Sequence, residues 1–272
     1  MSKVLIVILA VICLAPVYFL VIGSLTDAVG LFIMPPRVIP RNPSLDNYGY
    51  FLGLSIGRWA MNSGVVAVAT AVLSVTVSCA TGYAFAFFRF PGKRWLWLLL
   101  LAGVMVPRMS MMIPSFIVLR KLGILNTLFG LVISRTLSPM GMYLARAYFE
   151  TVPMSLLDAA RIDGASDFQA LTRVVVPISK PIVTCLALFA GTGALGDYVW
   201  QTLLLQRAEK HTLLIGLLRS VADDKIVGSP ELMVNQLGRE LAASMLLLIP
   251  LLLIFSVASR YFVSALGGAL KE

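Results

Sequence analysis

Residues 151–181 read TVPMSLLDAARIDGASDFQALTRVVVPISKP, a polar stretch that interrupts a strongly apolar chain. Pro153 suits the first position of a helix, and Gly164 suits the left-handed residue that closes one. Ser166, with a glutamine three residues later, forms a capping box that begins a second helix, and Pro177 limits that helix. The stretch therefore predicts two short helices joined by a tight turn.

Charged side chains hold this helix-turn-helix segment in water. They are Asp158, Arg161, Asp163, Asp167 and Arg173. Ala159 and Ala160 present a small-residue surface that another protein could approach closely. Local chemistry leaves two interpretations open, a solvated connection between helices and a docking element for a partner.

The composition around this segment indicates a membrane protein. Of 272 residues, 59% are hydrophobic and 13% are charged, against about 25% charged residues in soluble domains. Three cysteines inside apolar runs cannot form a disulfide framework, and a single histidine excludes a multi-histidine zinc site. The net charge of +9 is spread in basic runs of at most two residues, which suits anionic lipid and acidic partner surfaces and not nucleic acid.

Apolar runs long enough to cross a bilayer number six, at about 20 residues each. They cover residues 4–25, 60–88, 95–119, 127–149, 181–198 and 241–262. Pro107 and Pro114 are expected to break or kink the third run. Residues 26–58, with four prolines, and residues 201–238 are predicted to be loops outside the membrane. The fold class is thus an all-α integral membrane protein of six transmembrane helices in one domain, residues 1–272, with both termini on one side.

The two sides of the membrane carry ten Lys and Arg residues each, so the positive-inside rule does not decide the orientation.

Charged residues inside spans are costly, so each is treated as a candidate functional residue. Arg135 and Asp197 are the two cases. Each is interpreted either as part of a structural ion pair or partner contact, or as a residue that lines a solute path. Tyr198 and Trp200 either stack on a sugar ring or anchor the chain at the membrane boundary.

No phosphate-binding loop of the G-x-x-x-x-G-K-[ST] type is present, because Gly92 and Lys93 are followed by Arg94 and lack the earlier glycine. Two further classes stay open as alternatives. A self-sufficient secondary transporter would need inverted repeats and acidic residues at midplane, and neither is evident. An intramembrane protease would need a second aspartate beside Asp197, or a histidine in the membrane, whereas His211 lies in a predicted loop and is expected on the surface.

Asp158-Ala-Ala-x-x-x-Gly164, followed by Val176-Pro177, resembles the EAA loop of the permease subunits of bacterial ABC importers. The phrase DAARIDGAS is similar to the version in carbohydrate importers of the maltose type. The resemblance extends along nearly the whole chain, through Asn62-Ser63, Pro107 and Pro114, residues 122–127 (LGILNT), 212–216 (TLLIG), 260–263 (RYFV) and 268–271 (GALK).

The resemblance implies the type I permease fold with a cytoplasmic coupling helix in residues 151–180. Its ATPase-coupling residues would be Asp158, Ala159, Ala160, Asp163, Gly164 and Pro177. It also implies that the chain lies in the bacterial inner membrane with both termini cytoplasmic, beside membrane lipid. Its partners would be a second homologous permease, two cytoplasmic ATPase subunits and an extracytoplasmic sugar-binding protein. The chain itself would bind no cofactor and have no catalytic or metal site, because the ATPase subunits bind ATP and Mg²⁺.

The candidate residues of the solute path are Asn62, Arg135, Asp197 and Tyr198. The resemblance marks a loop for contact with the binding protein. In related subunits the loop after span five faces the binding protein. In this chain that loop contains Asp223, Asp224, Lys225 and Gly228. Two positions depart from the family. Asp158 replaces the usual Glu and is one methylene shorter, and Gly196-Asp197 replaces the common Trp-Asn, so substrate contacts do not transfer at that position.

Overall fold

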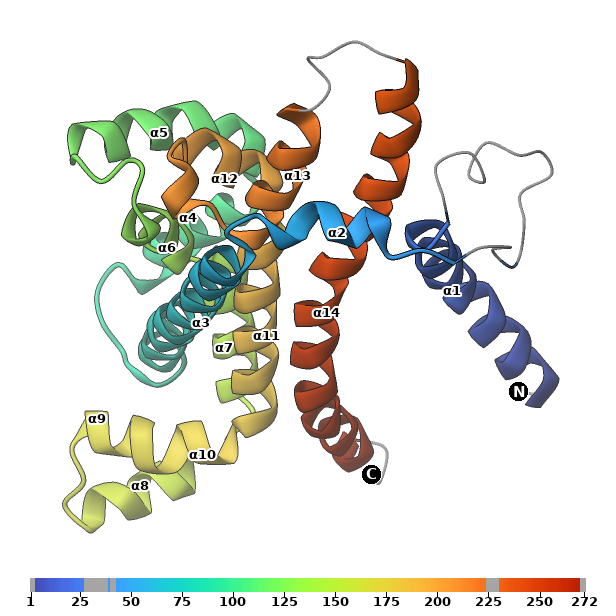
Figure 1. The fold of residues 1–272 in the computed structure, drawn as a ribbon. Coiled ribbons are helices and arrows are strands. Elements are labelled where there is room, and N and C mark those ends of the chain that lie inside the picture. Colours follow the sequence, from blue (N-terminus) through green and yellow to red (C-terminus); the bar gives the residue numbers. More distant parts are fainter. Residues whose placement is uncertain (1–2, 27–38, 40–42, 224–229, 270–272) are drawn as a thin grey trace. The chain divides into compact units, whose positions relative to one another are not determined.

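The computed structural model describes residues 3–26, 39, 43–223 and 230–269, with the side chains of the last helix described over residues 236–256. The described chain is helical throughout (Figure 1). Its contacts cluster in two compact units, residues 1–61 with 211–253 and residues 62–210 with 254–272.

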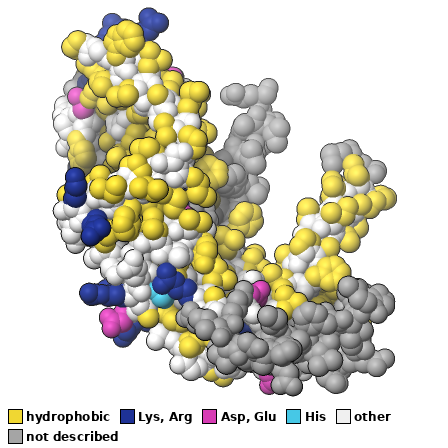
Figure 2. Space-filling model, turned by 90° about the horizontal axis from the view of Figure 1, so that it is seen from above, with side chains coloured by type: hydrophobic (Ala, Val, Ile, Leu, Met, Phe, Trp, Pro, Cys, Tyr) yellow, Lys and Arg dark blue, Asp and Glu magenta, His cyan; other side chains and the backbone are white. Residues whose placement is uncertain are grey.

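Three helices are long and apolar enough to cross a membrane, by length and composition. They are α1 (Lys3–Ser24), α3 (Ile56–Phe87) and α14 (Pro230–Ala269). Three bent helix pairs bring the number of spans to as many as six if each pair counts as one. Figure 2 shows hydrophobic side chains over much of the visible surface. This arrangement confirms the predicted all-α membrane fold.

The first unit is built on α2 (Asp46–Leu52) and α13 (Leu213–Asp223), together with α1, the start of α3 and most of α14. Its core contains Phe51, Trp59, Leu213, Leu217, Val221, Ala242 and Ala243. Gly216 fits directly against the Trp59 indole, because a Cβ there would lie 2.3 Å from ring atoms. The Tyr50 hydroxyl donates to the Ser220 carbonyl at 2.6 Å.

These helices correct the loop predictions. Residues 26–58 contain α2 and the beginning of α3, and residues 201–238 contain α13 and the first turns of α14, which starts at Pro230. His211 is also misplaced by the sequence argument, since it is 6% exposed. Its ring lies 6.5 Å from the Trp59 ring, centroid to centroid. The reason is the same in each case: packing on Trp59 and its neighbours orders polar segments that lack the length of a span.

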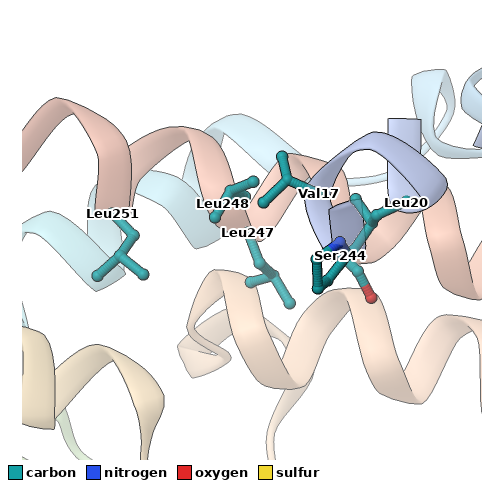
Figure 3. Close-up of a pocket in the computed structure, with 7 residues that line it drawn as sticks. Val17, Leu20, Ser244, Leu247, Leu248 and Leu251 are labelled. Atoms are coloured by element: carbon teal, nitrogen blue, oxygen red, sulfur yellow. The ribbon is translucent and has the colours of Figure 1, made fainter. Parts of the chain in front are cut away.

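The helices α1 and α14 border a shallow groove in this unit (Figure 3). It is lined by Pro16, Val17, Leu20, Ser244, Leu247, Leu248 and Leu251. The Ser244 hydroxyl donates to the Glu240 carbonyl at 2.8 Å, so it is satisfied within its own helix. None of the most apolar window of α1 is buried within the chain. The groove and α1 therefore present apolar surface of the kind that lipid or another helix covers.

The second unit contains the three bent pairs. Helices α4 (Lys93–Met105) and α5 (Met112–Lys121) meet at 101° across the 3₁₀ turn η2 (Arg108–Met111). The break falls at Pro107, as expected, because proline has no N–H group to donate to the backbone hydrogen bonds of a helix. Pro114 does not add a break, since it lies in the first turn of α5, where the N–H groups have no helical partner.

The fourth predicted span is two helices, α6 (Leu128–Thr136) and α7 (Pro139–Phe149), that meet at 46°. Ser138 caps α7 by accepting the Gly141 N–H at 3.1 Å, and Pro139 takes the first helical position. The bend thus follows from a cap and a proline inside an apolar run.

Helices α3 and α7 cross at very short range in this unit. A Cβ on Gly82 would lie 2.7 Å from the Ala145 Cβ and 2.8 Å from the Arg146 nitrogen. A Cβ on Gly141 would lie 2.8 Å from the Ser78 hydroxyl. Small residues at helix crossings allow the backbones of membrane helices to approach closely. The crossing fixes the part of α7 that leads into the segment at residues 151–180.

Candidate functional site

The segment at residues 151–180 forms a helical hairpin, which we call the hairpin. Its first arm is α8 (Met154–Ile162), and its second arm runs through α9 (Asp167–Gln169), a π-helical turn (Ala170–Val175) and α10 (Val176–Ile178). The second arm meets α11 (Lys180–Gly196) at 88°. Figure 1 shows the two arms lying together at the lower ends of α7 and α11.

The turn of the hairpin has the backbone geometry that the sequence predicts. Gly164 has φ +83°, in the left-handed region. Its N–H donates to the Arg161 carbonyl at 3.0 Å, and the Ala165 N–H donates to the Ala160 carbonyl at 2.9 Å. These two bonds form a Schellman motif, which satisfies carbonyls that the end of α8 leaves free.

The capping box that begins the second arm is also present. The Ser166 hydroxyl accepts the Gln169 N–H at 3.3 Å, and the Gln169 side-chain oxygen accepts the Ser166 N–H at 2.9 Å. Pro177 lies next to the end of this arm, as expected, because the helical residues end at Ile178 and the chain then bends by 88° into α11. A π turn precedes the proline.

A buried cluster attaches the hairpin to the ends of the membrane helices. Leu157 of the first arm and Ala170 and Val175 of the second are 0% exposed. They pack with side chains of α3, α7 and α11, namely Cys79, Tyr83, Ala145, Phe149 and Leu186. The hairpin and three helices therefore share one buried, close-packed cluster.

Other side chains of the hairpin are exposed. Ile162 is 86% exposed and Phe168 is 74% exposed. The Asp158 side chain is 58% exposed and lies 3.7 Å from Arg161, which also lies 3.3 Å from Asp167. Exposed pairs of this kind contribute about 0–1 kcal/mol and leave their charges available to a partner.

The remaining predicted coupling residues lie on the same hairpin. Ala159 is exposed and Ala160 is half-buried. Asp163 is exposed and forms the C-cap of α8, and Pro177 is exposed in α10. The structure thus brings the predicted coupling residues together on one hairpin, and their contact with an ATPase stays a prediction.

A second group of charged side chains lies where two helices are broken. Arg135 in the last turn of α6 contacts Asp197, which lies between α11 and α12 (Tyr198–Leu204), with 2.7 Å between Nη2 and Oδ2. The other terminal nitrogen of Arg135 donates to the Gly193 carbonyl at 2.6 Å. Arg108 of η2 approaches the same Oδ2 at 3.6 Å. We call Arg108, Arg135 and Asp197 the charge cluster.

Asp197 also caps α12. Its Oδ1 accepts the Trp200 N–H at 3.2 Å. The Trp200 indole N–H donates to the Ser134 hydroxyl at 2.8 Å, and Trp200 is 5% exposed. The ion-pair interpretation of Arg135 and Asp197 therefore has a direct geometric basis, and Trp200 is a buried packing residue.

The other predicted path residues are less connected to the charge cluster. Tyr198 begins α12 and is 42% exposed. Asn62 is 8% exposed, and its side-chain amide donates to the Glu209 carbonyl at 3.1 Å. A role of these residues in a solute path stays a prediction.

The predicted binding-protein loop lies largely outside the described residues. Asp224, Lys225 and Gly228 belong to that part, and Asp223 is described as the last residue of α13 without its side chain.

Sequence reasoning missed Arg108 as a member of the charge cluster. Its signal was a basic residue beside Pro107 in an otherwise apolar run. The break at that proline brings Arg108 to Asp197, and this contact over 89 positions of sequence leaves no local pattern.

Bent candidate spans and a polar helical hairpin between two of them are typical of helical membrane transport proteins. The chain belongs to the family of binding-protein-dependent transport system inner membrane components, whose model matches residues 49–268. It is therefore an inner membrane permease component of a binding-protein-dependent ABC importer, as the resemblance predicts.

Relatives match over most of their length. The chain is 32% identical over 247 residues to the galactooligosaccharides transport system permease protein GanQ of Bacillus subtilis (strain 168), covering 88% of this chain and 84% of GanQ. It is 29% identical over 273 residues to the sn-glycerol-3-phosphate transport system permease protein UgpE of Brucella suis biovar 1 (strain 1330), covering 96% and 94%.

A solved structure has the same fold. It is a chain in the crystal structure of a bacterial ABC transporter involved in the import of the acidic polysaccharide alginate, with a TM-score of 0.80 and 25% identity. The match covers 95% of this chain and 94% of that chain.

Proposed function

We propose that this chain is the transmembrane subunit of an importer for saccharides or related polyols, and that the hairpin couples it to cytoplasmic ATPase subunits. A second homologous permease completes the solute path, and two ATPase subunits bind ATP and Mg²⁺. An extracytoplasmic binding protein delivers the solute. The names of the relatives, which include oligosaccharide and glycerol-phosphate permeases, support this solute class.

The observation that carries the coupling proposal is the two-sided hairpin. One side is buried in the cluster with α3, α7 and α11. Outside this cluster the hairpin exposes Ile162, Phe168 and the Asp158 carboxylate. Large exposed apolar side chains near charged ones are typical of a docking surface for another protein. A hairpin that docks on one side and packs against spans on the other is suited to transmit ATP-driven motion.

The orientation follows from this role. An ATPase works in the cytoplasm, so the hairpin faces the cytoplasm and, with six spans, both termini do as well. The end of α13 and the residues after it, namely Asp223, Asp224, Lys225 and Gly228, then face the binding protein. Movement of the hairpin by ATP binding and hydrolysis would shift the permease between inward-facing and outward-facing states.

The test uses the whole importer, purified from membranes through a tag on this chain. We expect Ile162→Asp and Asp158→Lys each to release the ATPase subunits and to reduce ATP-dependent uptake by about tenfold or more, as for loss of an interface hot spot. Arg173→Gln on the second arm is the control, because Arg173 is an exposed charged residue of the same hairpin that is not among the predicted coupling residues. Retention of the ATPase and normal uptake in the Ile162 and Asp158 variants would overturn the coupling proposal.

A further inference from the structure

The charge cluster has one more positive than negative charge. Arg108 and Arg135 both approach Oδ2 of Asp197, at 3.6 and 2.7 Å. The other carboxylate oxygen is occupied, since it accepts the Trp200 N–H. One carboxylate cannot neutralise two guanidinium groups, so the cluster keeps a net charge of +1. Among the described residues, no second carboxylate forms an ion pair with either arginine.

The two arginines differ in how exposed their side chains are and in how many of their guanidinium N–H groups are hydrogen-bonded within the chain. The Arg135 side chain is 6% exposed, and its two terminal nitrogens are held by Asp197 and the Gly193 carbonyl. The Arg108 side chain is 61% exposed and makes only the longer contact with Asp197. Guanidinium has five N–H donors in a planar fork, which matches the oxygens of a carboxylate or phosphate. The positive charge that Asp197 does not neutralise therefore lies at the surface of the chain, on the exposed guanidinium group of Arg108.

The position of the cluster indicates an aqueous surface and not lipid. Arg108 directly follows the 101° break between α4 and the helical stretch Arg108–Lys121, and Asp197 lies in the break between α11 and α12. Irregular backbone at membrane depth is tolerated where it is buried in protein or lines a water-filled cavity. Charged side chains within spans likewise face the interior of a bundle or such a cavity. A water-filled solute path would accommodate both the irregular backbone at these two helix breaks and the exposed guanidinium of Arg108.

We propose that Arg108, held beside the Arg135–Asp197 pair, is an anion-recognition residue of the solute path, and that it favours solutes with a carboxylate or a phosphate monoester. The solute anion accepts hydrogen bonds from the outward N–H groups of Arg108, and the excess charge of the cluster is neutralised. Arg135 is a positioning residue, since it fixes Asp197 and thereby Arg108. This inference rests on the proposed importer function and assigns its solutes to the acidic sugars and sugar or polyol phosphates.

The first test measures binding at Arg108 without requiring transport. The importer, in nanodiscs, is treated with phenylglyoxal, which modifies exposed arginines, and modification of each site is followed by mass spectrometry. The probes are digalacturonate and its neutral counterpart galactobiose, at equal ionic strength. We expect digalacturonate to slow the modification of Arg108 several-fold and galactobiose to leave it unchanged. Arg120, exposed on the same half-span without a described ion pair, is the internal control.

The second test measures selectivity through ATP-dependent uptake of the two probes. We expect Arg108→Gln to lower the uptake of digalacturonate relative to galactobiose by about tenfold or more, as for loss of a charge-assisted hydrogen bond. Arg108→Lys should retain part of the preference, and Arg120→Gln should retain all of it.

Three results would overturn the proposal. They are equal protection of Arg108 by both probes, no protection by either, and protection by the nanodisc lipid alone, which would assign the site to a phospholipid headgroup. Absence of ATP-dependent uptake of any solute by the wild-type importer would instead contradict the proposed function. The labelling result distinguishes the two failures, because it does not depend on ATP.

Discussion

At the scale of single residues, Asp197 is the residue on which the charge cluster depends. Its carboxylate holds the buried Arg135, approaches Arg108 and caps α12. Asp197→Asn would leave two guanidinium groups near each other without a counter-charge. Breaking a buried ion pair in this way costs about 3–5 kcal/mol. We expect a clear loss of thermal stability in the purified importer, measured by the temperature at which the subunits aggregate.

The matched control removes the buried cation as well. The double variant Arg135→Leu with Asp197→Asn leaves no unpaired buried charge, so it should recover part of the lost stability. If Asp197→Asn alone is as stable as the wild type, the ion pair does not hold α6 and α12 together.

Gly164 gives a second prediction at this scale. A glycine is favoured there by the backbone conformation alone and not by lack of space for a side chain. Its φ is +83°, and a Cβ there would meet no atom within 4 Å. Gly164→Val should cost about 1–2 kcal/mol of left-handed strain, raise hydrogen exchange in the last turn of α8 and reduce coupled uptake. Gly164→Asn, which tolerates this conformation, should stay close to the wild type. Equal behaviour of the two variants would contradict the backbone argument.

At the scale of elements, the crossing of α3 and α7 depends on Gly82. Gly82→Ala places a Cβ within 2.7 Å of Ala145 and 2.8 Å of backbone, so the helices must separate. We expect a lower yield of assembled importer and weaker uptake. Gly64→Ala on the same helix is the control, since a Cβ there meets nothing within 4 Å. The alanine there should even favour the helix, by up to about 1 kcal/mol. A Gly82→Ala importer that assembles like the Gly64→Ala importer would show that the crossing is looser than described.

The elements also show how far the sequence predicts this structure. The hairpin was predictable because its signals are local: Gly164 closes one helix and Ser166 opens the next within three residues. The break at Pro107 was predictable for the same reason. Helices α2 and α13 were not, because their order comes from residues distant in sequence, such as Trp59 against Gly216 and Tyr50 with Ser220.

The same distinction applies to the candidate site. The sequence predicted Asp158 and Gly164 on a common hairpin, and it marked Arg135 and Asp197 as costly charges. It offered an ion pair as one interpretation of each charge, but it did not predict that the two pair with each other or that Arg108 joins them, because separate helix breaks create those contacts. His211 was misjudged for a related reason, since a polar segment was interpreted as exposed, whereas His211 is buried with its ring 6.5 Å from the Trp59 ring, centroid to centroid.

At the scale of the whole molecule, much apolar surface is left uncovered by the chain itself. No part of the most apolar window of α1 is buried, and the groove lined by α1 and α14 is apolar. The hairpin exposes Ile162 and Phe168 as well. Such surface is expected of a subunit that functions in lipid and in an assembly, and the family to which the chain belongs is named for a transport system of several components.

The measurement that tests the central claim most directly is solute uptake into vesicles, with the chain alone and with the complete purified importer. The account predicts uptake only when the ATPase subunits and ATP are present, and loss of this uptake in the Ile162→Asp variant while the chain still inserts. Uptake by the chain alone, driven by an ion gradient or by the solute gradient, would contradict the account and would make the chain a self-sufficient transporter.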